Sequence, residues 1–167
     1  MMHQDKAILL CLSGLDTEDF IHRAAPHLPE KSRLILLYVL DTRAYDERGY
    51  STSPLDPSQV EGDVSALEVE HGIMAAEELE AQEVLNVAES KLLRLGFNPH
   101  ATTRQVRKGR PEREIIDVSQ QPDLDIGLVV IGCNYKRGFK TGPGPLSVGR
   151  VARFVVEHSG CDVLLLR

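Results

Sequence analysis

The sequence predicts an α/β fold, a three-layer sandwich in which helices cover both faces of a five-stranded parallel sheet. Three short apolar runs, at residues 6–13, 33–40 and 126–131, indicate strands that are buried on both faces. Segments with helical patterning lie between the strand patterns, and this alternation favours parallel strands joined by crossover helices. The 167 residues are the length of one domain, so a single domain spanning 1–167 is expected.

The first half of the chain supplies two of these buried strands and the helix between them. Residues 6–13 form a nearly continuous apolar run that ends at Gly14, and residues 33–40 have the same character. Between them, residues 17–28 are expected to form a helix, because Asp and Thr are good N-caps and a proline follows the last residue. Residues 41–71 are predicted to form a long loop, since prolines, glycines, serines and aspartates crowd most of it.

The second half predicts a long helix, two shorter helices and three strands. Apolar residues recur at helical spacing over residues 72–95 and form one stripe, and Gly96 is well placed to end the helix. The other expected elements are a weakly alternating strand at 100–107, a helix at 111–120, the buried strand at 126–131, a Gly/Pro-rich loop at 133–147, a helix at 148–158 and a closing strand at 162–166.

The composition excludes several functional classes. The formal net charge is −6, which argues against nucleic-acid binding, because neutralising phosphates requires clustered cations. No apolar run approaches the ~20 residues that span a bilayer, so no membrane segment is expected. Residues 1–6 lack the basic and then apolar layout of a signal peptide, and a cytoplasmic location is therefore predicted.

The residue types that carry chemistry are scattered along the chain. The three cysteines, Cys11, Cys133 and Cys161, show no CxxC spacing, so buried thiols are favoured over a zinc or disulfide-exchange site. A redox role for Cys11 and Cys133, which end neighbouring predicted strands, stays open. The carboxylates of residues 61–83 are interpreted as a solvated helix surface, and neither a metal site nor a set of catalytic residues is expected.

One loop differs from the rest of the chain in its charge. In open α/β sheets, ligands bind beyond the carboxyl ends of the strands, where the strand order reverses. Residues 132–150 follow such a strand, open a helix, contain no acidic residue and carry four cations, Lys136, Arg137, Lys140 and Arg150. Free backbone N–H groups, the helix dipole and these cations together favour a phosphate group. The alternative is a surface loop whose glycines and prolines only form turns, and both interpretations stay open.

Several short motifs occur in the order found in a known family. Residues 36–41 resemble an L-L-H-V-x-D strand, residues 106–111 a V-x-x-G-x-P strand and turn, and residues 128–132 a V-V-x-G strand. Residues 149–166 resemble a helix followed by a C-P-V-L-V-V strand. On these motifs, nearly the whole chain resembles a universal stress protein domain. The resemblance implies the adenine-nucleotide α-hydrolase-like form of the Rossmann-like sandwich, with strand order 3-2-1-4-5.

The resemblance also implies where a nucleotide such as ATP or AMP would bind. In the ATP-binding branch, an Asp at the end of the first strand contacts the nucleotide, and Ser13 takes that position here. The phosphates lie on a G-x2-G-x9-G-(S/T) loop, of which Gly132 and Gly149 match the first and last glycine. Here the loop between them, residues 133–147, is longer and modified, and Arg150 replaces the hydroxyl residue. Two interpretations of Arg150 stay open: it offers phosphate a charge-assisted hydrogen bond, or its longer side chain fills the pocket. The candidate nucleotide- or anion-binding residues are Ser13, Gly14, Val39, Gly109, Gly132, Lys136, Gly138, Gly149 and Arg150.

Two main functions follow, with an enzyme as a third. The first is a stress-response or signalling protein that binds a nucleotide or another phosphate-bearing ligand through residues 132–150. The alternative is a homodimeric interaction module that binds no nucleotide and acts on an unidentified protein partner, because an apolar edge strand needs covering and members of the resembled family pair through it. Its candidate interface residues are Val163, Leu164, Leu165 and Leu166. The third is an enzyme of related fold, for which the sequence supports at most slow nucleotide hydrolysis.

Overall fold

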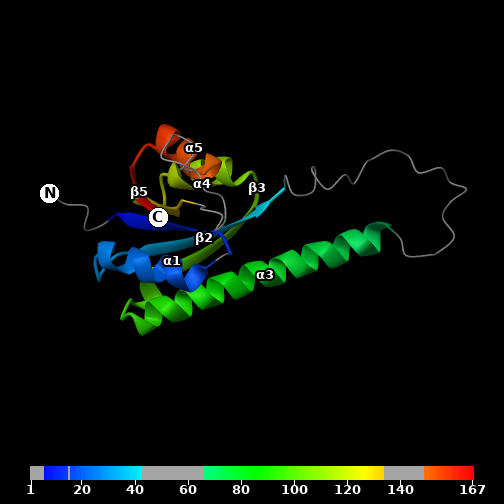
Figure 1. Cartoon of the computed structure of the whole chain (residues 1–167), viewed down its shortest axis with the longest axis horizontal. Helices are drawn as coiled ribbons and strands as arrows, with labels where there is room; N and C mark the ends of the chain where they lie inside the picture. Colours follow the sequence, from blue (N-terminus) through cyan, green and yellow to red (C-terminus); the bar gives the residue numbers. More distant parts are fainter. Residues whose placement is uncertain (1–5, 15, 43–65, 134–148) are drawn as a thin grey trace, which may run out of the picture.

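The computed structural model has three layers, with helices on both sides of a five-stranded sheet (Figure 1). It describes residues 6–14, 16–42, 66–133 and 149–167. The strands are β1 (Ala7–Leu12), β2 (Leu34–Asp41), β3 (Thr102–Gly109), β4 (Ile126–Gly132) and β5 (Asp162–Leu166). The helices are α1 (Thr17–Ala24), α3 (Ala66–Arg94), α4 (Pro111–Ser119) and α5 (Arg150–His158), with 3-10 turns at Ala25–His27 and Pro99–Ala101.

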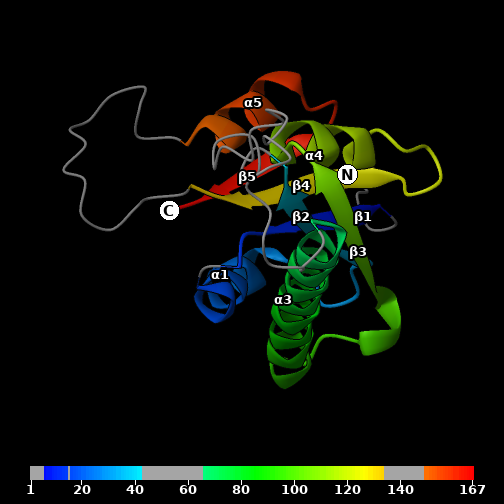
Figure 2. The ribbon, with the colours of Figure 1, turned by 90° about the vertical axis from the view of Figure 1, so that its right-hand side faces the viewer.

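All neighbouring strands are parallel, and the sheet has the order β3-β2-β1-β4-β5, which confirms the predicted fold class and strand order. β1 lies at the centre, where Leu10 is in register with Leu36 of β2 on one side and with Val130 of β4 on the other. Figure 2 shows α1 and α3 on one face of the sheet and α4 and α5 on the other. The strand order therefore reverses between β1 and β4, which is where ligands bind in folds of this kind.

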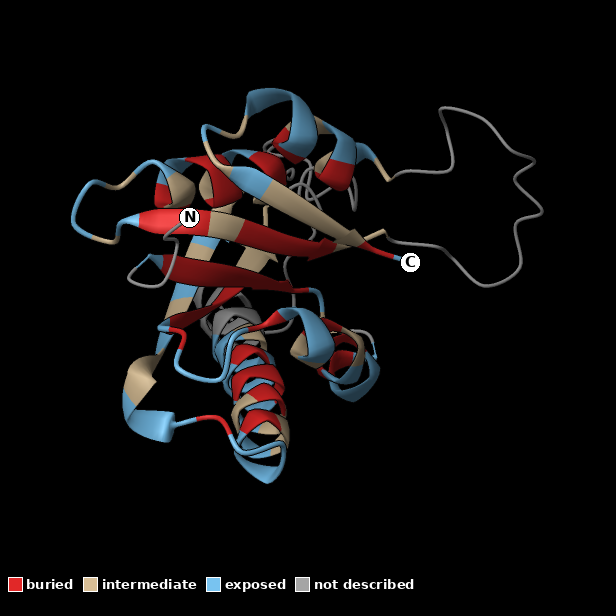
Figure 3. Cartoon of the chain, turned by 90° about the vertical axis from the view of Figure 1, so that its left-hand side faces the viewer, coloured by how far each residue is buried: buried red, intermediate tan, exposed pale blue. Residues whose placement is uncertain are grey.

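Alternate residues of the central strands build two separate cores, one on each face of the sheet. Leu10 and Leu36 join side chains of α1 and α3 in one apolar cluster, whereas Leu9 and Leu37 join side chains of α4 and α5 in the other. β1 and most of β2 are buried, as the red ribbons of Figure 3 show. Burial on both faces explains why these strands are uniformly apolar in sequence and do not alternate.

α3 begins earlier than the sequence predicts. Its first residue is Ala66, so residues 66–71, the last part of the predicted loop 41–71, are helical. The prediction took Gly72 as the start of the helix, but a single glycine costs only about 1 kcal/mol relative to alanine and does not stop a helix. The preceding Ala, Leu and Glu residues are good helix formers and continue it towards the N-terminus. Residues 43–65 lie outside the described residues.

The C-terminal end of α3 closes as the sequence predicts. Gly96 adopts a φ of +90°, in the left-handed region where glycine carries no strain. Its N–H donates to the carbonyl of Leu93 at 3.0 Å, and the N–H of Phe97 donates to the carbonyl of Leu92 at 3.1 Å. This pair of hydrogen bonds is a Schellman motif, which satisfies carbonyl groups at the end of the helix and redirects the chain towards β3.

α1 is shorter than the predicted helix at residues 17–28. It ends at Ala24 and is followed by the 3-10 turn that contains Pro26. Pro26 has no N–H group and cannot continue the hydrogen bonding of an α-helix, which accounts for the early end. Asp16 precedes α1 as expected, but its φ is 52° and its side chain makes no capping hydrogen bond.

α3 is a helix of 29 residues and carries charged side chains along its length. Across the ranges that the structure describes, no helix combines enough length with enough apolarity to cross a membrane. The cytoplasmic location stays a prediction.

Candidate functional site

A cavity of about 670 Å³ lies at the carboxyl edge of the sheet, where the strand order reverses. Its described lining comes from the ends of β1, β2 and β4, from the first turns of α4 and α5, and from one side each of α1 and α3. A volume of this size suits a small organic ligand. The apolar lining includes Leu12, Leu37, Val39 and Ile131, and the charged residues of the described lining are Asp41, Glu77, Glu80 and Arg150.

The turn after β1 brings Ser13 to the cavity and packs Gly14 against β2. Gly14 has a φ of +76°, a left-handed conformation that a residue with a side chain adopts only with strain. A Cβ atom on Gly14 would also lie 3.2 Å from the hydroxyl oxygen of Tyr38, closer than an ordinary contact. Glycine at this position therefore allows the Tyr38 side chain to lie directly against the turn.

Tyr38 links β2 to α3 beside the cavity. Its hydroxyl donates a hydrogen bond to Oε1 of Glu80 at 3.3 Å. Burial raises the pKa of Tyr38 above its ordinary value, and the nearby carboxylate of Glu80 raises it further. The hydroxyl consequently stays protonated at neutral pH and remains a hydrogen-bond donor.

The end of β4 and the first turn of α5 form another part of the cavity wall. Gly132 ends β4, and Gly149 and Arg150 begin α5. The N-terminus of a helix presents free N–H groups and the positive end of the helix dipole, which together favour an anion. A Cβ atom on Gly132 would lie 3.6 Å from the Phe20 ring, an ordinary contact, so the protein core does not require glycine there.

Arg150 has an acidic partner within the protein. Its Nη2 donates to Oε1 of Glu112 at 3.1 Å, and this ion pair joins the first turn of α5 to the first turn of α4. The Glu112 side chain is 8% exposed, whereas the Arg150 side chain is 69% exposed. The sequence predicts Arg150 as a donor to phosphate, but it does not reveal Glu112, which lies 38 residues away on another helix. Their contact depends on how α4 packs against α5.

The cavity also contains carboxylates that the sequence placed on a solvated helix surface. Glu77 and Glu80 lie about one turn apart on α3, and both line the cavity together with Asp41 at the end of β2. Their i, i+3 spacing places them on one side of the helix. The sequence contains this spacing, which shows that the two residues share one side of the helix. It does not show which part of the molecule that side faces.

The structure brings a subset of the candidate residues together. The cavity lining includes Ser13, Val39, Gly132, Gly149 and Arg150. Gly14 lines a neighbouring cavity of about 520 Å³ between α1 and α3. Gly109 ends β3 with a φ of +157°, a conformation that residues with side chains rarely adopt, so the backbone accounts for this glycine. Lys136 and Gly138 lie outside the described residues.

The cysteines and the metal-binding residue types show no assembled chemistry in the described parts of the chain. There, no group of three or more His, Cys, Asp or Glu residues is placed to hold a metal ion. Cys11 is buried, and burial raises the pKa of its thiol well above the ordinary value. Since the thiolate is the reactive form, this burial disfavours reaction of Cys11 at neutral pH. Cys133 and Cys161 are half-buried thiols.

β5 forms one edge of the sheet, and its side chains alternate between the two cores. Leu164 and Leu166 pack on the α1 and α3 side, and Val163 and Leu165 pack on the α4 and α5 side. Leu166 is 7% exposed and the other three are half-buried. These four side chains thus pack in the two cores of their own chain. At this edge of the sheet, the backbone of β5 and the partly exposed side chains remain accessible to a partner.

The chain is therefore a Rossmann-like α/β protein with a ligand-sized cavity at the reversal of its strand order. The universal stress protein family matches residues 6–167, and the chain belongs to this family, as its motifs predict. No curated protein sequence matches the chain significantly.

Solved structures share the fold over nearly the whole chain. The hypothetical protein MJ0577 has a TM-score of 0.70 at 20% identity, covering 98% of this chain and 96% of that one. A universal stress protein from Archaeoglobus fulgidus in complex with dAMP has a TM-score of 0.56 at 16% identity, covering 97% and 98%. A universal stress protein in complex with cAMP has a TM-score of 0.55 at 16% identity, covering 98% and 97%. At these identities the likeness establishes the fold.

Proposed function

We propose that this chain is a stress-response or signalling protein that binds an adenine nucleotide, or a related phosphate-bearing ligand, in the cavity at the carboxyl edge of the sheet. The observation that carries the proposal is the position of this cavity. It lies at the reversal of strand order, with Ser13 of the β1 turn and Gly149 at the start of α5 in its lining. Ligands bind at this place in open parallel sheets, and phosphates favour helix N-termini.

The chemistry of the lining supports a nucleotide as the ligand. Apolar side chains such as Val39 and Ile131 provide a surface for a base. Asp41 offers a carboxylate that can accept hydrogen bonds from sugar hydroxyls, and the first N–H groups of α5 can donate to a phosphate. Proteins of the same fold have been captured with dAMP and with cAMP.

The proposal is tested by measuring the thermal unfolding midpoint of the purified protein with ATP, ADP, AMP and cAMP, each with and without Mg²⁺. A ligand present at about 100 times its Kd stabilises the folded state by about 2.7 kcal/mol, which gives a readily measured increase. Release of inorganic phosphate is followed in parallel, because turnover would add an enzymatic activity to the binding. No increase with any of the four ligands at millimolar concentration would contradict the proposal.

A pair of glycine substitutions assigns any binding to this cavity. Gly132→Ala adds a methyl group where Gly132 lines the cavity, and the ordinary contact with Phe20 leaves room for it in the fold. Gly160→Ala adds the same methyl group at a place with no atom within 4 Å. We expect Gly132→Ala to weaken nucleotide binding, Gly160→Ala to leave it unchanged, and both ligand-free proteins to unfold near the wild-type temperature. Equal affinities for the two variants would place the ligand elsewhere.

The half-covered edge strand β5 supports homodimerisation as a second candidate function. Sedimentation velocity of the wild-type protein measures the oligomeric state directly. Val163→Lys places a charge on β5, and a charged side chain at a sheet edge opposes pairing. Val106→Lys makes the same change on β3, the opposite edge of the sheet, where Val106 is 37% exposed. A dimer that Val163→Lys dissociates and Val106→Lys preserves would support pairing through β5, and a monomeric wild-type protein would exclude it.

A further inference from the structure

We propose that the cavity of about 520 Å³ between α1 and α3 binds an aliphatic polyamine, a ligand in which methylene chains separate several ammonium groups. This is a second site, and the inference does not depend on nucleotide binding, although Glu80 lines both cavities. Three observations carry it: the carboxylates of the lining, a buried hydroxyl group without a partner, and an apolar strip on α3.

Carboxylates from two helices line this cavity. The start of α1 and one side of α3 contribute them: Asp16, Glu18, Asp19, Glu80 and Glu83. The described lining includes no lysine, arginine or histidine. Leu15, which lies between two lining residues and outside the described ones, is uncharged. The undescribed residues 43–65 join α3 at Ala66, about 21 Å from Glu80 along the helix axis. The acidic character of the described lining thus comes from α1 and α3 themselves.

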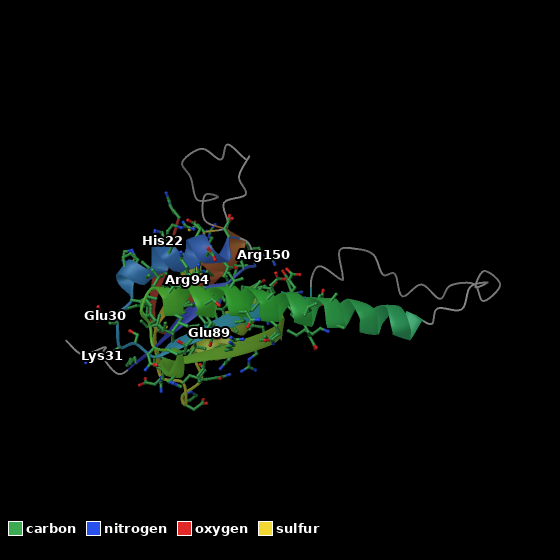
Figure 4. The ribbon with its side chains drawn as sticks, turned by 90° about the horizontal axis from the view of Figure 1, so that it is seen from below. His22, Glu30, Lys31, Glu89, Arg94 and Arg150 are labelled. Atoms are coloured by element: carbon green, nitrogen blue, oxygen red, sulfur yellow. The ribbon has the colours of Figure 1, made fainter. Side chains whose placement is uncertain are left out.

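Three of these carboxylates already have partners within the protein. Glu18 pairs with Arg94 at 2.8 Å, and Figure 4 shows Arg94 of α3 beside α1. Asp19 pairs with Arg23 on its own helix at 2.9 Å, and Glu80 accepts the hydrogen bond from the tyrosine hydroxyl described above. The Glu18 and Asp19 side chains are nevertheless 55% and 61% exposed, so a ligand can still reach them.

Two carboxylates and one hydroxyl group have no such partner. The side chains of Asp16 and Glu83 form no ion pair or hydrogen bond with a described residue, and Asp16 does not cap α1. Thr17 lines the cavity and is only 9% exposed, yet its hydroxyl makes no hydrogen bond with a described residue either. A largely buried polar group without a partner is costly. A ligand that donates a hydrogen bond to this hydroxyl removes that cost.

The arrangement of the lining favours an organic cation over a metal ion. Among the described residues, no group of three or more His, Cys, Asp or Glu is placed to hold a metal ion. The carboxylates are instead distributed around a cavity large enough for a small organic molecule. Val84 and Val87 lie about one turn apart on α3 and give the lining an apolar strip. In a polyamine, ammonium groups donate to the carboxylates and to the Thr17 hydroxyl, while methylene groups contact the valines.

Isothermal titration of the full chain with spermidine, at low salt and without nucleotide, tests the proposal. We expect saturable binding of one spermidine per chain. Putrescine has one ammonium group fewer and should bind more weakly, and high salt should weaken both interactions, because the carboxylates are partly exposed and salt screens them. Magnesium chloride at the same concentrations is the comparison cation, and we expect no saturable binding of Mg²⁺.

A matched pair of substitutions separates this cavity from the general acidity of α3. Glu83→Gln removes a negative charge from the lining, whereas Glu78→Gln removes one from an exposed residue of the same helix outside the described lining. We expect Glu83→Gln to raise the Kd for spermidine about fivefold and Glu78→Gln to raise it less than about twofold. Thr17→Val keeps the shape of the side chain, removes the hydroxyl and should also raise the Kd about fivefold. A thermal melt of each ligand-free variant confirms that it is folded before titration.

The possible outcomes are distinct. If spermidine shows no saturable binding at low salt, the proposal is refuted. Equal affinities of Glu83→Gln and Glu78→Gln would also refute it, because the overall negative charge of the protein would then account for the binding. If Mg²⁺ binds with the same stoichiometry and affinity as spermidine, the site belongs to a metal ion and not to a polyamine. An unchanged Kd for Thr17→Val would refute the role of the hydroxyl group.

Discussion

The two faces of the sheet border the cavity with different interactions. On the α1 and α3 face, the neutral hydroxyl of Tyr38 donates to Glu80, and the Tyr38 residue is only 9% exposed. On the α4 and α5 face, Arg150 pairs with Glu112, and the arginine side chain is 69% exposed. Packing holds the first contact in place, whereas solvent, salt and ligands can reach the second. One face therefore fixes the shape of the cavity, whereas the ion pair on the other face is open to solvent.

The largest expected effects test whether the two faces are equally well packed. Leu9 and Leu10 are adjacent in β1, point to opposite faces and are both 0% exposed. We expect Leu9→Ala and Leu10→Ala each to lower the free energy of unfolding by about 2–5 kcal/mol, through lost burial and the cavity left behind. Urea denaturation monitored by circular dichroism measures both values. A much smaller loss for one of them would show that its face can collapse around the missing side chain.

A smaller effect is expected from the contact on the α1 and α3 face. Tyr38→Phe keeps the ring and removes the hydroxyl that donates to Glu80. Because the hydrogen bond connects a buried residue to a carboxylate, we expect the free energy of unfolding at neutral pH to decrease by about 1 kcal/mol. Equilibrium denaturation of the variant beside the wild type provides the measurement. An unchanged stability would mean that this hydrogen bond contributes nothing to the fold in solution.

The same residue predicts a difference at alkaline pH. The pKa of Tyr38 is raised in the folded protein, chiefly by burial and then by Glu80, so deprotonation favours unfolding. Its contribution to stability is complete below the unfolded pKa of about 10 and is lost as the pH rises through the higher folded pKa. The wild-type protein should therefore lose more stability than Tyr38→Phe between pH 8 and pH 11. Parallel urea titrations across this range would contradict the prediction if the two curves stayed a constant distance apart.

The smallest effect is expected from an exposed ion pair on the α4 and α5 face. Arg153 and Glu157 lie 3.1 Å apart on α5, with side chains that are 56% and 53% exposed. Glu157→Gln should lower the free energy of unfolding by no more than about 0.5 kcal/mol, and 1 M salt should remove most of that difference. Denaturation at low and high salt measures both quantities. A loss of several kcal/mol would show that solvent exposure does not make this ion pair weaker than the pair of Arg150 and Glu112.

The fold was predictable from the sequence because its central strands are buried on both faces. The apolar runs at residues 6–13, 33–40 and 126–131 correspond closely to β1, β2 and β4. The start of α3 was not predictable in the same way, because nothing local marks it and a glycine inside the helix resembles a boundary. The misplaced start shortens the predicted helix, and the predicted order of the strands is not affected.

The sequence predicted those parts of the candidate site that consist of backbone at the end of a strand or the start of a helix. Gly132 and Gly149 mark the end of a strand and the start of a helix, and both line the cavity. Glu80 and Glu112 were missed because their roles depend on which element packs beside them, on contacts with Tyr38 and Arg150 from distant parts of the chain. Helical spacing shows that a side chain lies on a given side of a helix, but it does not identify the neighbour.

The central position of β1 has a consequence for how the chain is made. β1 is synthesised before the other strands that the structure describes, and one of its edges pairs with β2, which follows soon after it. Its other edge pairs with residues 126–131 of β4, which are synthesised only after most of the chain. Until then, a strand rich in leucine has one edge without its native partner, and such edges promote association between unfinished chains. The strand that later forms the middle of the sheet is thus the one whose second edge waits longest for its native partner.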